Sequence, residues 1–174
     1  MFCALMLVAL GSFALVEGSV QYPKLTSCSD GDKITISDMA IQDAQIGKKM
    51  LANFTLIVKE PLESNPTLKV TITTAEGEEV GCYDSVGSCS YKMCDGTSTV
   101  EQLLGQEWDN ACPVPKITSP ISVQVPLPSA VQVLIGTAPT TVNFALDVID
   151  GGSSAGCEKF DVEIKAEEEG GDDE

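Results

Sequence analysis

Residues 67–73 read TLKVTIT, and this short stretch decides the fold class. Leu68, Val70 and Ile72 are apolar, and the residues between and around them are threonine or lysine. Successive side chains of a β-strand point to opposite faces, so an apolar residue at every second position predicts a strand with one buried and one wet face. A helix would need apolar residues three and four positions apart.

The same period of two recurs on both sides of this stretch. Apolar and polar residues alternate at 53–58, 121–127, 142–148 and 160–164, and residues 33–41 and 79–83 add further strands. Turn-forming segments separate them, including Pro61 to Pro66 and the glycine-rich hairpin from Asp150 to Gly156. Seven or more short strands at this spacing predict an all-β fold, an antiparallel sandwich. A capping-box pattern at Ser98 and Glu101 predicts one short helix, cut short at Gly105.

The composition limits the classes of function. The 174 residues include 10 Lys or Arg, 26 Asp or Glu and no histidine, for a net charge of −16. Phosphate binding needs clustered basic residues, so we expect no nucleic acid as a partner. Without histidine, a Ser–His or Cys–His nucleophilic site cannot form. We therefore expect no enzyme, no catalytic residue, no metal and no cofactor, with a hydrolase built on a carboxylate pair as the remaining enzymatic alternative.

Both ends of the chain are expected to lie outside the domain. The apolar run at 2–16, followed by Glu17-Gly18-Ser19, is typical of a secretory signal peptide, which would make residues 1–18 the part that is removed. A membrane anchor is disfavoured because the run is shorter than the roughly 20 residues that a spanning helix needs. Residues 167–174 contain six acidic residues and two glycines, typical of a disordered tail. The domain is therefore expected to span residues 19–166.

Removal of residues 1–18 discards Cys3 and leaves an even number of cysteines. The six that remain are Cys28, Cys82, Cys89, Cys94, Cys112 and Cys157. In a secreted or lysosomal chain these six cysteines predict disulfides, and 15 ways of pairing them stay open on the sequence alone.

The chain also carries one glycosylation sequon, Asn53-Phe54-Thr55. The strand alternation places Asn53 on the outer face.

Periodicity does not say whether the two inner faces fill the space between them. The inward positions are mostly aliphatic, and 5% of all residues are aromatic. Taken alone, this pattern favours an ordinary filled core. A lipid-binding protein would instead show an internal apolar cavity of many hundreds of Å³, whereas a protein-binding domain would show a filled core and an exposed apolar patch.

The cysteine-rich middle of the chain resembles the ML lipid-recognition family, and within it the ganglioside-activator members. The resemblance is carried by Cys82-YDSVGS-Cys89-SYKM-Cys94 and by Cys112-Pro113-Val114-Pro115. The sequon, the stretch from Pro61 to Val70, and the cysteines near both ends support it over residues 24–166. The chain departs from those members by lacking an extra cysteine pair after Cys112 and a tryptophan at 126–131. These departures point away from ganglioside extraction and leave lipid binding as the expectation.

The resemblance implies an immunoglobulin-like β-sandwich whose splayed sheets enclose an apolar lipid cavity. It also implies the disulfides Cys28–Cys157, Cys82–Cys89 and Cys94–Cys112, with a Cys89–Cys94 pair as the alternative. The expected function is binding or transfer of a glycolipid, phospholipid or fatty acid. Transient membrane contact and a lipid-processing enzyme or receptor are the further partners it implies. The alternative is a secreted innate-immunity or allergen-like interaction protein with a filled core that binds a protein.

The candidate lipid-binding residues are inward positions of the predicted strands, together with Trp108. For Trp108, the rim of the cavity mouth and a plug of its interior are both open interpretations. The apolar run at 131–135 is interpreted as a strand that ends in a lip, in preference to a membrane-contacting loop. The candidates are Phe54, Leu56, Val58, Leu68, Val70, Ile72, Trp108, Val123, Val125, Val133, Ile135, Phe144, Leu146 and Phe160.

Overall fold

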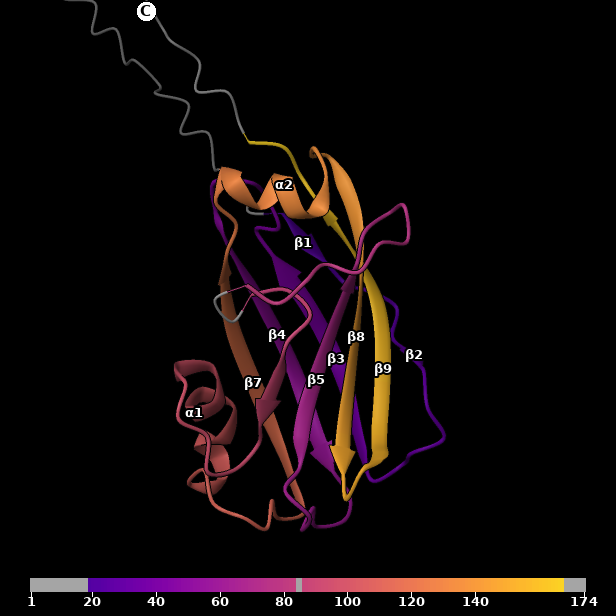
Figure 1. Cartoon of the computed structure of the whole chain (residues 1–174), viewed down its shortest axis with the longest axis vertical. Coiled ribbons are helices and arrows are strands. Elements are labelled where there is room, and N and C mark those ends of the chain that lie inside the picture. Colours follow the sequence, from indigo (N-terminus) through magenta and orange to yellow (C-terminus); the bar gives the residue numbers. More distant parts are fainter. Residues whose placement is uncertain (1–18, 84–85, 168–174) are drawn as a thin grey trace, which may run out of the picture.

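The computed structural model describes residues 19–83 and 86–167 and shows an all-β sandwich of two antiparallel sheets (Figure 1). One sheet has the strand order β1-β3-β4-β7, and the other has the order β2-β9-β8-β5-β6. The expected signal peptide at 1–18 and the part of the acidic tail at 168–174 lie outside the described residues. The fold class predicted from the alternating strands is confirmed.

The strands of both sheets vary in length, and two short helical segments lie in the connections between the sheets. The first sheet contains β1 (Val20–Gln21), β3 (Ile34–Gln42), β4 (Lys49–Val58) and β7 (Ile117–Pro126). The second contains β2 (Thr26–Ser27), β9 (Ser153–Ile164), β8 (Thr140–Asp150), β5 (Thr67–Thr73) and β6 (Ser90–Lys92). The helical segments are α1 (Thr99–Gly105) with η1 (Gln106–Trp108), and η2 (Ser129–Val131) with α2 (Gln132–Ile135).

The strand that decides the fold class lies where its pattern predicts. In β5, Val70 pairs with Leu146 of β8, and Ile72 pairs with Phe144. Phe144 in turn pairs with Phe160 of β9. Residues that face each other across antiparallel strands share one face of the sheet. The period of two therefore continues across three neighbouring strands as one apolar inner face.

Two predicted strands take a different form. Residues 79–83 form isolated bridges instead of a strand, and the place beside β5 is taken by β6, in which Tyr91 pairs with Leu68. Residues 131–135 form the end of η2 and all of α2. In α2 the backbone N–H of Gly136 donates to the Gln132 carbonyl at 3.0 Å and closes the helical turn. The side-chain amide oxygen of Gln132 also accepts a hydrogen bond from the backbone N–H of Ala138 at 3.0 Å. The expected strand with a lip is thus wrong for this segment.

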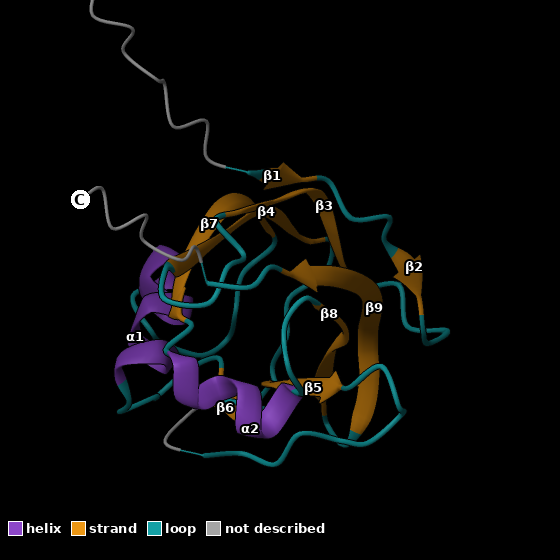
Figure 2. Cartoon of the chain, turned by 90° about the horizontal axis from the view of Figure 1, so that it is seen from above, coloured by secondary structure: helices purple, strands orange, loops and turns teal. Residues whose placement is uncertain are grey.

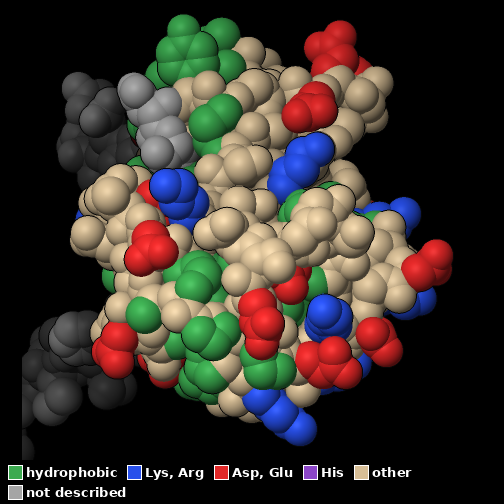
Figure 3. Space-filling view, turned by 60° about the horizontal axis from the view of Figure 1, so that its bottom comes forward, with side chains coloured by type: hydrophobic (Ala, Val, Ile, Leu, Met, Phe, Trp, Pro, Cys, Tyr) green, Lys and Arg blue, Asp and Glu red, His purple; other side chains and the backbone are tan. Residues whose placement is uncertain are grey.

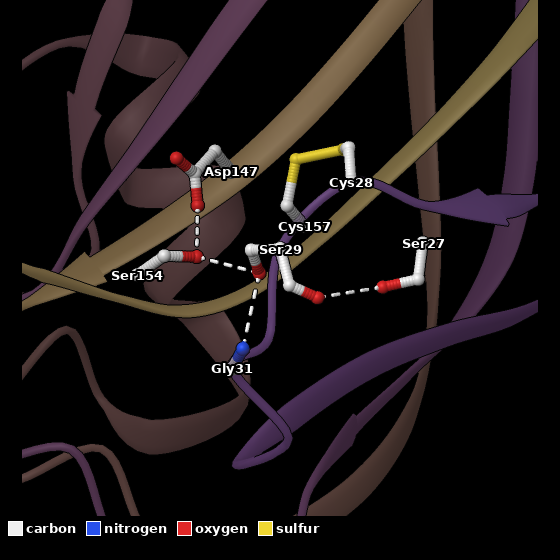
Figure 4. The surroundings of a disulfide bond; sticks show 7 residues. All are labelled: Ser27, Cys28, Ser29, Gly31, Asp147, Ser154 and Cys157. Atoms are coloured by element: carbon white, nitrogen blue, oxygen red, sulfur yellow. Dashed lines mark hydrogen bonds between the residues drawn. A yellow bond between two sulfur atoms is a disulfide. The ribbon is translucent and has the colours of Figure 1, made fainter.

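The sheets meet closely along the edge where β3 faces β9 (Figure 1). A side chain at Gly156 of β9 would collide with the backbone carbonyl of Ile34, and its Cβ would lie 2.6 Å from the Cγ2 atom of Ile34. The disulfide Cys28–Cys157 fixes the chain after β2 to β9 at the same edge (Figure 4). Beside it, Ser154 Oγ lies 2.6 Å from Asp147 Oδ1 and 2.8 Å from Ser29 Oγ. This edge of the sandwich is closed.

The opposite edge, where β7 and β6 end the two sheets, is bordered by the helical segments. Figure 2 shows α1 and α2 on this side, away from β9 and β2. The packed core forms two clusters, one with Trp108 and Leu62 and one with Val162 and Ile164. Among the described residues, no helix is both long and apolar enough to cross a membrane.

The predicted capping box starts α1 and also joins it to β6. The backbone N–H of Glu101 donates to Ser98 Oγ at 3.3 Å. The Glu101 carboxylate accepts hydrogen bonds from the backbone N–H groups of Lys92, Thr97 and Ser98, each at 3.0 Å. The bonds from Lys92 and then Ser98 are the main reason why the pKa of Glu101 is lowered from 4.5 to about 2.

Glu101→Gln is expected to lower stability at pH 7, because a neutral amide accepts these bonds more weakly than a carboxylate. A lost cap costs about 1 kcal/mol, which corresponds to a Tm lower by about 2–4 °C for a chain of this size. A carboxyl group whose pKa is lowered in the folded state stabilises the fold at pH values above its unfolded-state pKa. The Tm difference between the wild type and this variant should therefore shrink as the pH falls from 4.5 toward 2. Thermal unfolding over this pH range checks the result. Glu107→Gln, with the same charge change in exposed η1, is the control. An equal Tm loss in both variants would contradict the explanation.

The charged surface at the lower end of the sandwich is mixed. Figure 3 shows acidic and basic side chains interspersed on this face, with hydrophobic side chains between them. Interspersed charges of both signs make only a weak local field. This face therefore has no patch of a single sign, although the chain as a whole carries −16.

Candidate functional site

The two sheets enclose a cavity of about 550 Å³ between their inner faces. Its volume lies within the range of roughly 300–1,000 Å³ that is usual for small-molecule sites. The lining residues come from both sheets, from α1 and α2, and from the loop that the Cys82–Cys89 disulfide closes. The cavity is therefore the space between the splayed sheets.

The walls of the cavity are mainly the inward positions of seven strands, and nearly all of these residues are aliphatic or aromatic. Phe144 and Phe160 stack in one wall with their ring centroids 5.4 Å apart and an angle of 7° between their planes. From the first sheet the inward-facing lining residues are Met39, Ile41, Met50, Ala52, Phe54, Ile121, Val123 and Val125. The edge strand β7 also contributes Pro120, Ser122, Gln124 and Pro126. From the second sheet they are Leu68, Val70, Ile72, Tyr91, Val142, Phe144, Leu146, Phe160, Val162 and Ile164.

The cavity reaches the surface beside the two helical segments. Leu103 of α1 and Leu134 of α2 both line it, and they are 53% and 37% exposed. Exposed polar residues line the same side, namely Gln106 and Glu107 of η1 and Gln124 of β7. An apolar interior with a mixed apolar and polar mouth suits an amphipathic molecule whose hydrocarbon lies inside.

The interior of the large cavity carries no charge over the described residues. Its one acidic lining residue, Glu107, is exposed at the mouth, so this lining holds no carboxylate pair. Tyr91 has a phenol in the lining, and burial, followed by the charge of Glu101, raises the pKa of Tyr91. The phenol therefore stays neutral near pH 7, and the interior favours hydrocarbon over ions.

Ten of the predicted site residues lie together in this lining. They come from β4, β5, β7, β8 and β9, and one comes from α2. Their shared property is the inward position that the period of two, or the helical turn of α2, gives them. The ten are Phe54, Leu68, Val70, Ile72, Val123, Val125, Ile135, Phe144, Leu146 and Phe160.

The structure places the other four candidates elsewhere. Leu56 lines a separate small cavity, and Val58 is 1% exposed in the packed cluster at the end of β4. Trp108 is 6% exposed in the same cluster, and its Nε1–H donates to the Met93 carbonyl at 2.6 Å. It therefore lies in the packed core and not at the rim. Val133 is 88% exposed, because the turn of α2 directs Leu134 and Ile135 toward the cavity.

The sequence reasoning missed several lining residues. In β3 a bulge between Ser37 and Ala40 shifts the register, so the inward residues are Ile34 and Ile36 before it and Met39 and Ile41 after it. The sequence signal for this bulge is the step of three residues from Ile36 to Met39, where a regular strand would have a step of two. The leucines of α1 and α2, and Val86 of the disulfide loop, carry no such periodic signal because each lies in a short turn.

The three disulfides of the structure are Cys28–Cys157, Cys82–Cys89 and Cys94–Cys112. These are the pairs that the family resemblance implies, and the Cys89–Cys94 alternative is not formed. Asn53 lies in the middle of β4, paired with Ala40 and Ser122, at a partly exposed position that is not part of the cavity lining.

No protein-family model matches the chain, and a comparison with curated proteins finds no match. Among solved structures, the C-terminal domain of wzt is similar at a TM-score of 0.48 and 7% identity, over 84% of this chain and 79% of that one. A Niemann-Pick type C2 protein from the Japanese carpenter ant is similar at a TM-score of 0.39 and 11% identity, over 85% and 92%. A putative β-galactosidase from Bacteroides fragilis is similar at a TM-score of 0.34 and 14% identity, over 82% of this chain and 16% of that one. At these scores and identities the likenesses carry no argument about ligand or activity.

Proposed function

We propose that this protein is a non-catalytic lipid-binding protein that holds acyl chains between its two sheets. The observation that carries the proposal is the apolar cavity of about 550 Å³ with an uncharged interior. A filled core, as a protein-binding sandwich would have, leaves no such volume. Burial of hydrocarbon needs no acid, base or nucleophile, which agrees with a chain that contains no histidine.

The volume of the cavity matches a lipid tail. A cavity of about 150 Å³ accommodates benzene, or roughly 25 Å³ per carbon, so the cavity has room for on the order of 20 carbons. Each methylene removed from water contributes about 0.8 kcal/mol. A tail of 16–18 carbons would thus supply on the order of 10 kcal/mol before the entropy costs of binding.

The proposed ligands are glycolipids, phospholipids and fatty acids, and the proposed family is the ML lipid-recognition family. Its cysteine pattern and the three disulfides support that family. The disulfides also support an oxidising compartment, and we infer a secreted or lysosomal protein with a signal peptide at 1–18 and a glycan on Asn53. Transfer of the lipid to an enzyme, receptor or membrane would proceed through the mouth beside Leu103 and Leu134.

Purified protein incubated with palmitate, a phosphatidylcholine and a glycolipid is expected to form one-to-one lipid complexes in native mass spectrometry. Ligand that binds the folded state stabilises it by about 2.7 kcal/mol at a concentration 100-fold above Kd, so Tm should rise with lipid concentration. Glucose, which lacks a hydrocarbon chain, is the control. Absence of every lipid complex, together with an unchanged Tm, would overturn the proposed function.

A further inference from the structure

The strand β7 forms one edge of the first sheet, and this edge borders the large cavity. Among the described strands, β7 pairs with β4 alone. Its inward residues Ile121, Val123 and Val125 line the cavity. Ser122 and Gln124 line it as well, although both are exposed and alternate with the inward residues. Successive side chains of a strand lie on opposite faces, so the part of β7 that both sets share at the cavity is its backbone edge.

The hydrogen bonds at the end of β7 show which backbone groups point outward from the sheet. The Leu127 N–H donates to the Lys48 carbonyl at 2.9 Å, and the Leu127 carbonyl accepts a bond from the Gly47 N–H at 2.7 Å. Both backbone groups of Leu127 therefore point toward the β4 side. The register from Pro126 back to Ile117 has no interruption. Because consecutive residues direct these groups to alternate sides, the odd-numbered residues of β7 face β4 and the even-numbered residues face the free edge.

The two prolines of β7 agree with this assignment. Proline has no N–H, and within sheets it occurs on edge strands where that group would face away from the neighbouring strand. Pro120 and Pro126 are both even-numbered. Between them, Ser122 and Gln124 each present an N–H and a carbonyl to the edge, and these four groups are called the edge strip below. No hydrogen bond with another described residue satisfies the edge strip.

The edge strip lies at the mouth of the cavity. Figures 1 and 2 both show α1 beside β7 at this edge of the sandwich. Leu103 of α1 and Leu134 of α2 line the same cavity and are exposed. Glu107 is the one charged residue in the described lining, so like-charge repulsion disfavours an anionic headgroup at the mouth. A ligand that suits this site has a hydrocarbon chain for the interior and an uncharged polar unit for the edge strip.

The chemistry of a strand edge selects a polar unit that both donates and accepts. In a hydrogen-bonded pair of antiparallel strands, one residue uses its N–H and its carbonyl together to bond the residue opposite. Fatty acids, long-chain alcohols and glycerol esters have no such N–H. An N-acylated amino-acid residue has both groups, and its acyl chain starts at the same amide. Its polar part therefore matches the edge strip while its chain matches the apolar interior.

We propose that the edge strip recognises N-acylated peptides, whose first residue pairs with Ser122 or Gln124 while the acyl chain lies in the cavity. This inference rests on the proposed function, because the cavity must hold the chain, and it adds a ligand class to that function. Peptides that add a strand to a free sheet edge bind through such main-chain hydrogen bonds. Pro120 and Pro126 limit the pairing to a short peptide and protect the edge against a long strand of a second copy.

The ligand side is tested with three uncharged probes that carry the same 16-carbon acyl chain. They are N-palmitoyl-glycinamide, its ester analogue in which oxygen replaces the glycine N–H, and methyl palmitate. Competition binding is measured by native mass spectrometry at pH 7. For the wild type we expect N-palmitoyl-glycinamide to bind about tenfold more tightly than methyl palmitate, because it alone gains the hydrogen bonds of a full residue. The ester analogue should bind about fivefold more weakly than the glycinamide, since it offers no donor to the protein carbonyl.

The protein side is tested by Ser122→Pro combined with Gln124→Pro, which removes both N–H groups from the edge strip. Pairing with β4 should persist, because Pro120 and Pro126 already occupy the equivalent positions on either side. The preference for N-palmitoyl-glycinamide over methyl palmitate should fall about fivefold. Ser122→Ala combined with Gln124→Ala keeps both N–H groups and is the matched control, which should keep the wild-type preference. Because each preference is a ratio within one variant, partial unfolding does not alter it.

The outcomes separate this inference from the proposed function. If methyl palmitate binds the wild type as tightly as the glycinamide does, or if the proline variant keeps the preference, recognition by the edge strip is overturned while lipid binding stands. Loss of the preference in the alanine variant would also overturn it, as would a lipid-free dimer that the proline substitutions dissociate. If none of the three probes binds the wild type, the proposed function fails and the inference fails with it.

Discussion

Ala52→Phe combined with Val70→Phe is expected to lower the affinity for a 16-carbon lipid at least hundredfold while the sandwich stays folded. Ala52 lies in β4 and Val70 in β5, and both side chains line the large cavity from opposite sheets. The ring added at Ala52 is of the size that a cavity of about 150 Å³ accommodates. The change at Val70 adds less, because the ring replaces the valine methyl groups, so together the rings would fill part of the cavity of about 550 Å³.

The size of the effect follows from the displaced hydrocarbon. Excluding four methylenes removes about 3 kcal/mol of favourable burial, and each 1.4 kcal/mol is a factor of ten in Kd. Rings that enter an open cavity need not displace packed side chains, so unfolding free energy should be unchanged or higher. Native mass spectrometry and thermal unfolding measure the two quantities.

Leu51→Phe combined with Thr71→Phe is the matched control for this prediction. These residues lie in the same two strands, next to the substituted positions, and are not part of the cavity lining. Lipid affinity should stay close to that of the wild type. Retained binding in the Ala52 and Val70 variant would mean that lipid does not lie between the sheets.

Replacement of Cys28 and Cys157 together by serine is expected to cause the largest loss of stability. This disulfide joins residues 129 positions apart and fixes the closed edge of the sandwich. In the chain-entropy model a loop of this length contributes about 5 kcal/mol by restricting the unfolded chain. At about 2–4 °C per kcal/mol, Tm should fall by roughly 10–20 °C.

The short disulfide of the mouth provides the comparison. Cys82 and Cys89 are 7 positions apart, and the same model gives about 2.5 kcal/mol for their replacement by serine. Denaturant unfolding of both double variants, each with intact remaining disulfides, measures the two losses. If the Cys82–Cys89 variant were the less stable of the two, loop closure would not be the main contribution of the long disulfide.

The strand pattern and most of the cavity lining could be predicted because they follow from local periodicity. The inward residues of β5 and β8 repeat every two positions without interruption, and the structure uses that register. The bulge in β3 breaks the repeat, which is why Met39 and Ile41 escaped prediction. Residues 131–135 form an apolar run that is compatible with a strand, whereas the structure closes it into a helical turn, with a hydrogen bond from the Gly136 backbone N–H to the Gln132 carbonyl at 3.0 Å.

The existence of the cavity could not be derived from periodicity, since the same alternation is compatible with a filled core. The distance between the sheets depends on contacts at their edges, such as Gly156 against Ile34, which involve residues more than a hundred positions apart.

The space between the sheets also determines how the lipid-free protein should respond to hydrostatic pressure. Pressure favours the state of smaller total volume, and unfolding eliminates internal voids. A molecule that holds a void of about 550 Å³ should therefore unfold at a lower pressure than a filled sandwich of the same length and stability. Under the proposed function an acyl chain would occupy this void, so lipid loading and compression would act on the same volume in opposite directions.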